Sequence, residues 1–338
     1  MNFSKTHKPS RTATLNEYES QHSYIGAALG RVTERIKCAK FEIDGVEYKV
    51  SANDNNIHQI FVQKMFTASI NGDTVVMKYV SPDGEEGFPG EVTTEFTFRL
   101  TEENELILGY TATTTKPTPV NLSNHVYFNL AGHGAGNVGD HILTVNSCRH
   151  IPLDKEYIPL GDGTISDVKG TPFDLTTPTQ LRERMKDVLV SNYVFEGHGK
   201  KKHVAKLELP STGRTVDCFT TEPCMETYFS CAMGTMKGKN GATYGAYENG
   251  GLCLIPMQYT SAVNMTVVII IIMATGTLPS IKKTNFVASD KEKPKSPQPR
   301  LTSRASPSKI ADDRLVNSSL SNQTTSKFGK KSKKVKNK

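Results

Sequence analysis

The stretch PTPVNLSNHVYFNLAG, residues 117–132, is the most informative part of this sequence. It places His125 in a strand-like run, directly after Asn124 and before the aromatic pair Tyr127 and Phe128. Aromatic rings can cover the apolar side of a pyranose, while imidazole and amide groups can hydrogen-bond to its hydroxyls. These residues suit a sugar site at a strand end. The alternative is a buried histidine satisfied by a backbone carbonyl, and the residues alone favour that alternative.

The central part of the chain has the pattern of an antiparallel β protein. Residues 91–100, EVTTEFTFRL, alternate in polarity, and residues 105–114, ELILGYTATT, follow after a turn. This alternation predicts a hairpin with one buried face. The apolar run VVIIIIM, residues 267–273, is too short to span a bilayer and predicts a buried strand. Helical signals are few, and residues 177–189, TPTQLRERMKDVL, are the best candidate for a helix. An antiparallel β-sandwich with few helices is therefore predicted.

Charge divides the chain into two parts. The whole chain has a net charge of +7, and residues 282–338 hold 16 Lys/Arg against 4 Asp/Glu, which leaves −5 for residues 1–281. The end of the chain is rich in Lys, Ser and Pro, so we expect it to be disordered. Its KKSKKVK run, Lys330 to Lys336, is typical of a nuclear-localisation patch and could attract a non-specific anionic partner. The alternative is a solubilising end without a partner.

Other features of the sequence argue against several protein classes. The N-terminal residues MNFSKTHKPSR are basic and hydrophilic, unlike a secretory signal. The six cysteines show neither CxxC pairing nor the spacing of a zinc site. We therefore expect reduced thiols in a cytoplasmic protein that has no membrane partner. No metal or organic cofactor is implied.

The segment 117–132 closely resembles the TPVNLTNHSYFNLAG motif of the aldose 1-epimerase (galactose mutarotase) family. Further segments match that family in the same order. They are YIGAALGRVTERI (24–36), KFEIDGVEYKV (40–50), SPDGEEGFPGEV (81–92), GTPFDLTTP (170–178), GRTVDCFTTEP (213–223), GTMKGKNGATY (234–244) and GLCL…SAVN (251–264). The resemblance implies a large twisted antiparallel β-sandwich, galactose mutarotase-like, over residues 16–285. A disordered N-terminus (1–15) and a disordered basic tail (286–338) would flank it.

The reaction of the resembling family needs a base for the anomeric hydroxyl and an acid for the ring oxygen. The resemblance implies three groups: a C-terminal glutamate as base, a histidine in a G-F-D-H-N-F segment as acid, and the motif histidine near the ring oxygen. Only the motif histidine is retained, as His125. Ser191 stands at the acid position and Ile255 at the base position. No Asp or Glu occurs from residue 249 to 289, so a small shift of the alignment cannot restore the base.

The positions that the resemblance assigns to sugar hydroxyls are also altered. Tyr79 replaces an arginine before DGEEG, and Met233 replaces an aspartate. The family's HGG is reduced to His58-Gln59-Ile60, and Glu34 replaces the asparagine of GRxANRI. The retained polar residues that suit sugar binding best are Asn124, His125, Glu85 and Gln258. Weaker candidates are Glu86, Tyr259 and the histidines of a predicted Gly/Lys-rich hairpin loop, His198 and His203.

Only 23 residues precede Tyr24, where the resembling family has several more strands. We therefore expect one sheet to lack strands and to expose an edge. Either another chain covers that edge, or this is a shortened copy under little constraint. The sequence leaves the oligomeric state open.

These observations favour an aldose 1-epimerase-like carbohydrate-binding protein in which the interconversion of hexose anomers is lost or severely impaired. It would bind a small-molecule aldose, such as galactose or glucose, weakly at most. One alternative is an active aldose 1-epimerase of hexose metabolism that uses other groups. A second alternative is a non-catalytic interaction protein that acts through its basic tail.

Overall fold

In a computed structural model, the chain divides into a unit of Met1–Pro294 and a unit of Lys295–Lys338. All described residues lie in the first unit. They are residues 24–53, 64–161, 163–185, 190–197, 199–230, 236–237, 243–244, 250–265, 271–272 and 282–290.

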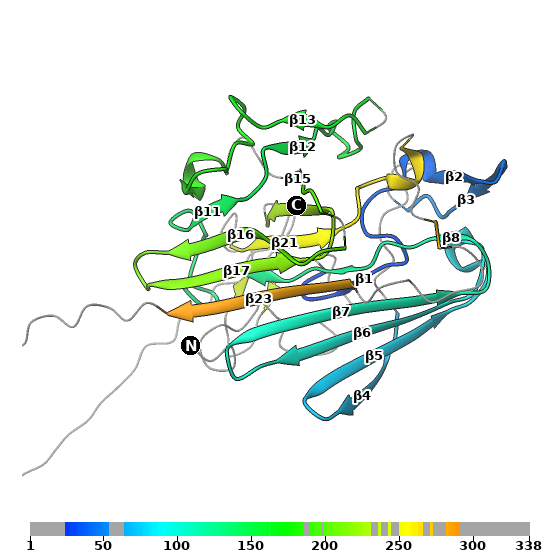
Figure 1. The fold of residues 1–338 in the computed structure, drawn as a ribbon, viewed down its shortest axis with the longest axis horizontal. Helices are drawn as coiled ribbons and strands as arrows, with labels where there is room; N and C mark the ends of the chain where they lie inside the picture. The colour runs from blue at the N-terminus through cyan, green and yellow to red at the C-terminus, as the bar shows by residue number, and fades with distance from the viewer. Residues whose placement is uncertain are drawn as a thin grey trace, which may run out of the picture. The chain divides into compact units, whose positions relative to one another are not determined.

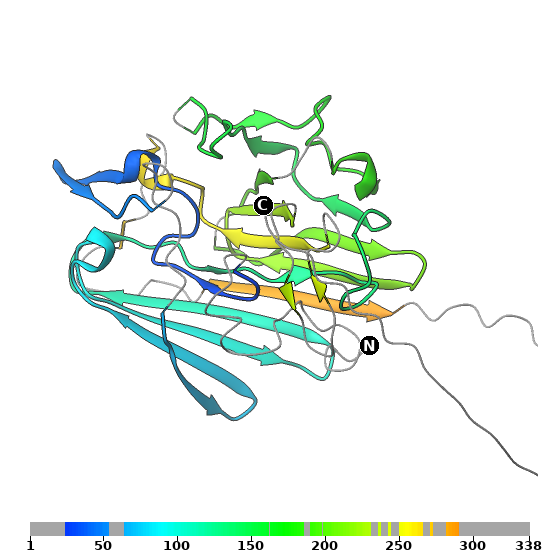
Figure 2. The same cartoon turned by 180° about the vertical axis from the view of Figure 1, so that it is seen from behind.

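Two antiparallel sheets dominate the fold (Figures 1 and 2). The larger sheet has nine strands, in the order β14 (Thr179–Gln180), β11 (Ile142–Val145), β16 (Lys202–Leu209), β17 (Arg214–Thr220), β23 (Lys282–Asp290), β7 (Glu105–Thr114), β6 (Val92–Leu100), β5 (Thr74–Ser81) and β4 (Thr67–Asn71). The smaller sheet has six strands, in the order β10 (Tyr127–Phe128), β21 (Leu252–Met257), β18 (Cys224–Phe229), β15 (Val190–Val194), β12 (Arg149–Ile151) and β13 (Ser166–Asp167). This arrangement confirms the predicted antiparallel β-sandwich.

Four short strand pairs accompany the two sheets. They are β1 (Ala28–Leu29) with β9 (Ser123–Asn124), β2 (Lys40–Ile43) with β3 (Val46–Lys49), β8 (Thr118–Pro119) with β22 (Ile271–Ile272), and β19 (Met236–Lys237) with β20 (Thr243–Tyr244). The described helical elements are short 3₁₀ turns: η1 (Lys37–Ala39), η2 (Glu85–Gly87), η3 (Leu181–Glu183) and η5 (Ala262–Asn264). No helix in the described ranges is long and apolar enough to cross a membrane.

The predicted hairpin is confirmed in β6 and β7, which pair from Val92 with Thr114 to Leu100 with Leu106. Along the first half of β6, every second residue is buried. The rings of Phe96 and Tyr110, opposite each other in register, meet edge to face with centroids 5.2 Å apart. Such aromatic pairs add stability beyond their buried area. The hairpin therefore supplies its inner face to the core because its sequence alternates with the period of a strand.

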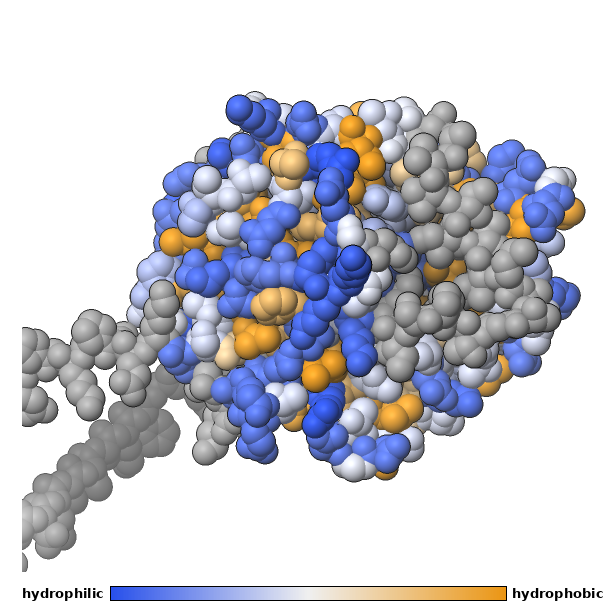
Figure 3. Space-filling view, viewed as in Figure 1, coloured by the Kyte–Doolittle hydropathy of each residue, from blue (hydrophilic) through white to orange (hydrophobic). Residues whose placement is uncertain are grey.

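Side chains from both sheets form the main core. Leu108 and Tyr110 of β7 are buried in the same cluster as Tyr193 of β15, Met225 of β18 and Leu254 of β21. The surface is different in character: the face in Figure 3 is mainly hydrophilic, with isolated apolar residues among the described ones. Alternate residues of a strand face opposite sides of a sheet. In the six-stranded sheet, the residues next to these core residues therefore point to its other face.

Three predictions about local structure are wrong or incomplete. Within the predicted helix at residues 177–189, Thr179 and Gln180 form β14 by pairing with β11 and Leu181–Glu183 form η3, while residues 186–189 lie outside the described ranges. The predicted domain boundary at residue 285 falls inside β23, where Phe286 is buried against the core. The predicted strand at residues 267–273 is described only at Ile271–Ile272, and its other residues lie outside the described ranges.

One buried cation fixes the segment that follows β1. Arg31 is 1% exposed, and its Nη2 donates to Ser81 Oγ at 2.6 Å while its Nη1 donates to the Pro89 carbonyl at 3.1 Å. Its guanidinium also lies 5.4 Å from the centre of the Phe88 ring. Burial lowers the pKa of Arg31 to about 10, which still leaves it charged at neutral pH. Residues 24–36 are therefore held to the end of β5 by a charged side chain.

Replacing Arg31 tests this anchor. Arg31→Met should lower the free energy of unfolding by about 1–3 kcal/mol for each buried acceptor that it leaves without a donor, and the Ser81 hydroxyl and the Pro89 carbonyl are two of these. Arg99→Met is the matched control, since Arg99 and its partner Asp73 are about half exposed and such pairs contribute at most about 1 kcal/mol. Urea unfolding of both variants measures the difference. Equal losses would contradict an anchoring role for Arg31.

Candidate functional site

His125 lies just after β9, against one face of the six-stranded sheet. Its Nδ1 is 3.3 Å from the Cys253 sulfur, and its ring stacks on Tyr127 with centroids 4.9 Å apart. The Tyr228 ring approaches edge-on at 6.0 Å. The residue is 7% exposed, and this burial lowers the pKa of its imidazole to about 4. The histidine is therefore a neutral group at physiological pH, packed between aromatic rings.

An apolar side chain fills the position to which the resemblance assigns the base. Ile255 of β21 is fully buried and clusters with Ile25 and Leu29 from the segment around β1, and with Tyr127 and Met257. Burying a side chain of this size stabilises the fold by about 1.5–3 kcal/mol. Ile255 is thus part of a small hydrophobic core.

The position to which the resemblance assigns the acid, Ser191, lies on the other side of the sheet from Ile255. Ser191 precedes Tyr193 by two residues in β15, and Tyr193 belongs to the core between the sheets. Strand alternation therefore turns Ser191 toward that core, away from the face that carries Ile255. Its neighbour Asn192 lies on the Ile255 face, where its Nδ2 donates to Glu226 Oε2 at 3.3 Å. The structure does not bring positions 191 and 255 together.

Glu226 is a carboxyl group at this site that sequence reasoning missed. It lies in β18 directly opposite Ile255 in β21, and opposite Asn192 in β15. It is 5% exposed, and its side chain shares a hydrogen bond with Glu34, which is 4% exposed. The sequence held a signal for it: a single charged residue inside the otherwise uncharged strand CMETYF. The strand register places the carboxyl group of Glu226 opposite Ile255.

Burial controls the protonation of this carboxyl pair. Loss of hydration, followed by repulsion from Glu34, raises the pKa of Glu226 well above its ordinary value. Burial also raises the pKa of Glu34, against the opposing charge of Arg35. The Arg35 Nη1 donates to Glu34 Oε2 at 3.1 Å, and its guanidinium lies 4.9 Å from the centre of the Tyr157 ring. The arrangement favours a protonated Glu226 that donates to an ionised Glu34.

Tyr79 and Glu85 form a separate group at the nine-stranded sheet. Tyr79 donates its hydroxyl hydrogen to Glu85 Oε1 at 2.7 Å, and the Lys64 ammonium lies 2.8 Å from the same oxygen. Burial opposes ionisation of Glu85, but hydrogen bonds from Lys64, Ser81 and Tyr79 outweigh it and lower its pKa. Burial first, and then the bond to Glu85, raises the pKa of Tyr79 to about 12.

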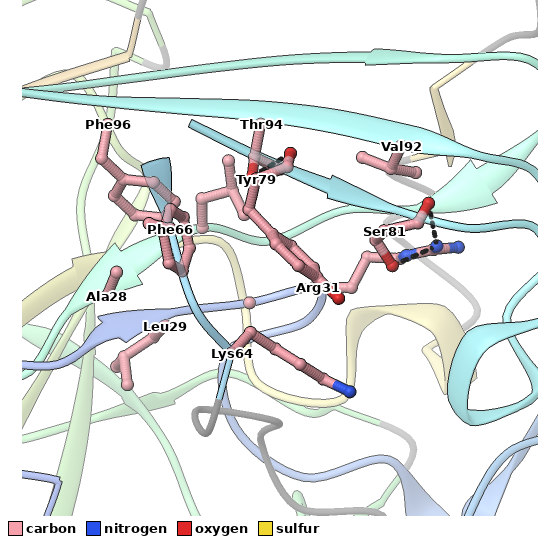
Figure 4. Close-up of a pocket in the computed structure, with 12 residues that line it drawn as sticks. Ala28, Leu29, Arg31, Lys64, Phe66, Tyr79, Ser81, Val92, Thr94 and Phe96 are labelled. Atoms are coloured by element: carbon pink, nitrogen blue, oxygen red, sulfur yellow. Dashed lines mark hydrogen bonds between the residues drawn. The ribbon is translucent and has the colours of Figure 1, made fainter. Parts of the chain in front are cut away.

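A pocket lies beside this group (Figure 4). The aromatic rings of Phe66 and Tyr79 and the stem of Lys64 are drawn around it, with Ala28 and Leu29 on the opposite wall. The residues lining it are Ala28, Leu29, Gly30, Arg31, Lys64, Phe66, Tyr79, Ser81, Val92, Thr94, Phe96 and Leu122. His125, Glu226 and Ile255 are not among them, so Tyr79 and the motif histidine do not line one cavity.

The other candidate residues have structural partners. Gln258 is 1% exposed, its Nε2 donates to Glu222 Oε2 at 2.5 Å, and its backbone N–H donates to Asn121 Oδ1. The Asn124 side chain, also buried, donates to the Gly26 carbonyl at 3.4 Å. Both amides therefore help to hold neighbouring segments in place.

The structure describes one histidine of the predicted hairpin loop and two further weak candidates. His203 lies on β16 rather than in a loop, 2.8 Å from Asp217, because the chain crosses here from one sheet to the other. Glu86 lies in η2, and Tyr259 packs beside a small cluster that includes Val194. Met233, His198 and the triplet at 58–60 lie outside the described residues. Within the described ranges, no three His, Cys, Asp or Glu side chains are grouped to hold a metal ion.

The raised pKa of Glu226 predicts a pH-dependent stability. Unfolding lowers that pKa to about 4.3, so the folded protein keeps a proton that the unfolded chain loses as the pH rises. The natural protein should therefore lose stability relative to Glu226→Gln between pH 5 and pH 8, by up to about 1.4 kcal/mol per pH unit. Glu91→Gln, at an exposed position, is the control. A pH-independent difference in urea unfolding would contradict the protonated state.

Comparison with known proteins identifies the family. The family model for aldose 1-epimerase matches residues 6–265. Galactose mutarotase of Sus scrofa is 37% identical over 262 residues, which cover 75% of each chain, and the Homo sapiens protein is 36% identical over the same length and coverage. Among solved structures, an aldose epimerase homologue from C. elegans has a TM-score of 0.75 at 23% identity, covering 83% of this chain and 87% of its own. The chain belongs to the aldose 1-epimerase family.

Proposed function

We propose that this protein binds an aldose at the His125 face of the six-stranded sheet, and that its interconversion of anomers is lost or severely impaired. Family membership supports a sugar ligand. The observation that carries the second half of the proposal is Ile255, which is fully buried in an apolar cluster at the position of the family's glutamate. A hydrocarbon side chain there cannot accept a proton. It also fills the space that a proton-accepting side chain would need.

The chemistry explains why this substitution matters. Opening the ring requires removal of the anomeric hydroxyl's proton and protonation of the ring oxygen as the C–O bond breaks. One positioned acid or base typically accelerates such a step by ~10²–10⁴-fold. Ile255 removes the base, and Ser191 faces the core between the sheets, so it supplies no acid on this face. His125 is neutral at physiological pH because burial lowers its pKa to about 4.

The aromatic rings at the His125 face are compatible with weak binding of a sugar. The rings of His125, Tyr127 and Tyr228 lie close together and could cover the apolar side of a pyranose. However, Ile25 and Leu29 pack on the same face, and His125 is only 7% exposed. A sugar must displace part of this packing, which reduces the affinity.

A slow but genuine epimerase is the second candidate, and one observation favours it. Glu226 places a carboxyl group on the same face as Ile255, one strand away. The two candidates differ in a single measurable quantity, the rate at which the protein equilibrates sugar anomers.

Polarimetry of freshly dissolved α-D-galactose measures that rate. The natural protein should relax the rotation little faster than buffer does. Ile255→Glu/Glu226→Gln places a carboxylate at the family's position beside an amide, and it should exceed Ile255→Gln/Glu226→Gln by ~10²-fold or more. The second variant is the control, because it has the same shape without a base. Rapid relaxation by the natural protein would contradict the impaired function, and saturation-transfer NMR with galactose tests binding separately.

A further inference from the structure

Glu226 has a position that the proposed function does not use. In antiparallel strands, directly opposed residues have Cβ atoms about 4.5–5.5 Å apart, and Glu226 is directly opposite Ile255. Tyr228, two residues further along β18, lies against His125 with ring centroids 6.0 Å apart. Residues two apart on a strand lie on the same face, about 6.5 Å from each other. Glu226 therefore lies on the same face of β18 as Tyr228, directly beside the position to which the resemblance assigns the base.

The surroundings keep one proton on the carboxyl pair. Two carboxyl groups can share a hydrogen bond only if one of them is protonated. Glu34 and Glu226 share such a bond, and the Arg35 guanidinium binds Glu34 at 3.1 Å. The cation therefore favours the negative charge on Glu34, which leaves the proton on Glu226. Asn192 completes the set by donating from its Nδ2 to Glu226 Oε2.

The other titratable groups near Glu226 do not supply a second charge. Cys224 and Cys253 are both fully buried, and burial raises the pKa of each thiol well above its ordinary value, so both stay neutral. His125, in contact with Cys253, is neutral as well. Arg35 and Glu34 are therefore the ion pair that faces Glu226, and they balance each other.

We propose that the carboxyl group of Glu226 is a catalytic group of this site, which opens the ring of a bound aldose by donating one proton and accepting another. The inference rests on the proposed aldose site. In it, the Glu226 O–H turns from Glu34 to the sugar and donates its proton to the ring oxygen, and the bond between the anomeric carbon and that oxygen breaks. The second carboxyl oxygen takes the proton of the anomeric hydroxyl, which becomes the aldehyde carbonyl.

Protons and charges balance in this step. The carboxyl group loses one proton and gains another, so it is neutral before and after, with its two oxygens exchanged in role. The open-chain sugar turns its aldehyde about the adjacent C–C bond, and the reverse transfer closes the ring as the other anomer. One group suffices, because the ring oxygen and the anomeric oxygen are attached to the same carbon.

A buried site favours this route over separate acid and base groups. Creating a charge on Glu226 in a poorly hydrated site is costly, and the concerted transfer creates none. The step needs room for the sugar beside Glu226, and the side chain of Ile255, packed under Ile25 and Leu29, occupies that room. The arrangement thus combines a competent carboxyl group with a blocked approach, which accounts for slow turnover in the natural protein.

Opening the blocked space tests the proposal. Ile255→Ala should accelerate the relaxation of α-D-galactose above the rate of the natural protein, and Ile255→Ala/Glu226→Gln should lose that gain by ~10²-fold. Ile255→Ala/Glu105→Gln is the matched control, since it removes a carboxyl group of the nine-stranded sheet and should keep the gain. The Ile255→Ala rate should also fall as the pH rises and Glu226 loses its proton, and it should show no fall on the acid side down to pH 5.

The outcomes separate a failure of the Glu226 role from a failure of the proposed aldose site. An Ile255→Ala/Glu226→Gln protein as fast as Ile255→Ala would overturn the role of Glu226, as would an Ile255→Ala protein that binds galactose by saturation-transfer NMR without accelerating its relaxation. Absence of binding in both the natural protein and Ile255→Ala would overturn the proposed function as well. Circular dichroism checks folding, and if Ile255→Ala does not fold, Ile255→Val carries the same comparison at a smaller expected gain.

Discussion

The register between β18 and β21 is the constraint on which the rest of the site depends. The side-chain period of a strand is two, so a slip by one residue would exchange every inward side chain with an outward one. Met225 and Leu254 on one face fill the core between the sheets, while Glu226 and Ile255 lie on the other. Because both faces of this sheet are buried, the packing tolerates only the observed register. The same constraint that builds the core therefore decides which polar groups meet.

Burial then determines the chemistry of those groups. His125 and Glu226 are both shielded from water, and in each case the neutral form is favoured, so one becomes a free imidazole and the other a carboxylic acid. Burial raises the pKa of Glu34 too, but Arg35 beside it favours the negative charge on Glu34 over one on Glu226. The site thus differs from a pair of separately ionised catalytic groups. It holds one ion pair, one proton on a carboxyl group and a ring that cannot be protonated near neutrality.

Tyr79 lines a pocket at the nine-stranded sheet, and His125 is not among the residues that line it. The resemblance groups Tyr79 with the sugar contacts, yet its hydroxyl is bound to Glu85 at the nine-stranded sheet. Leu29 lies between these regions, lining the pocket and also packing in the cluster of Ile255. Arg31, two residues later, anchors that segment through Ser81. The segment that carries Glu34 is therefore fixed to the end of β5.

The sequence by itself determined the fold class, the hairpin of β6 and β7, and the absence of the family's glutamate, because these follow from residue identity and from a period of two. It pointed to His125 and Ile255 for the same reason. It failed where distant segments compete: Thr179 and Gln180, inside the predicted helix, pair with β11, and β23 continues past residue 285 into the core. Only the tertiary structure placed Ser191 on the core side and brought Glu34 to Glu226. These two glutamates are far apart in the chain, and strand register, not local pattern, decides which side chains meet.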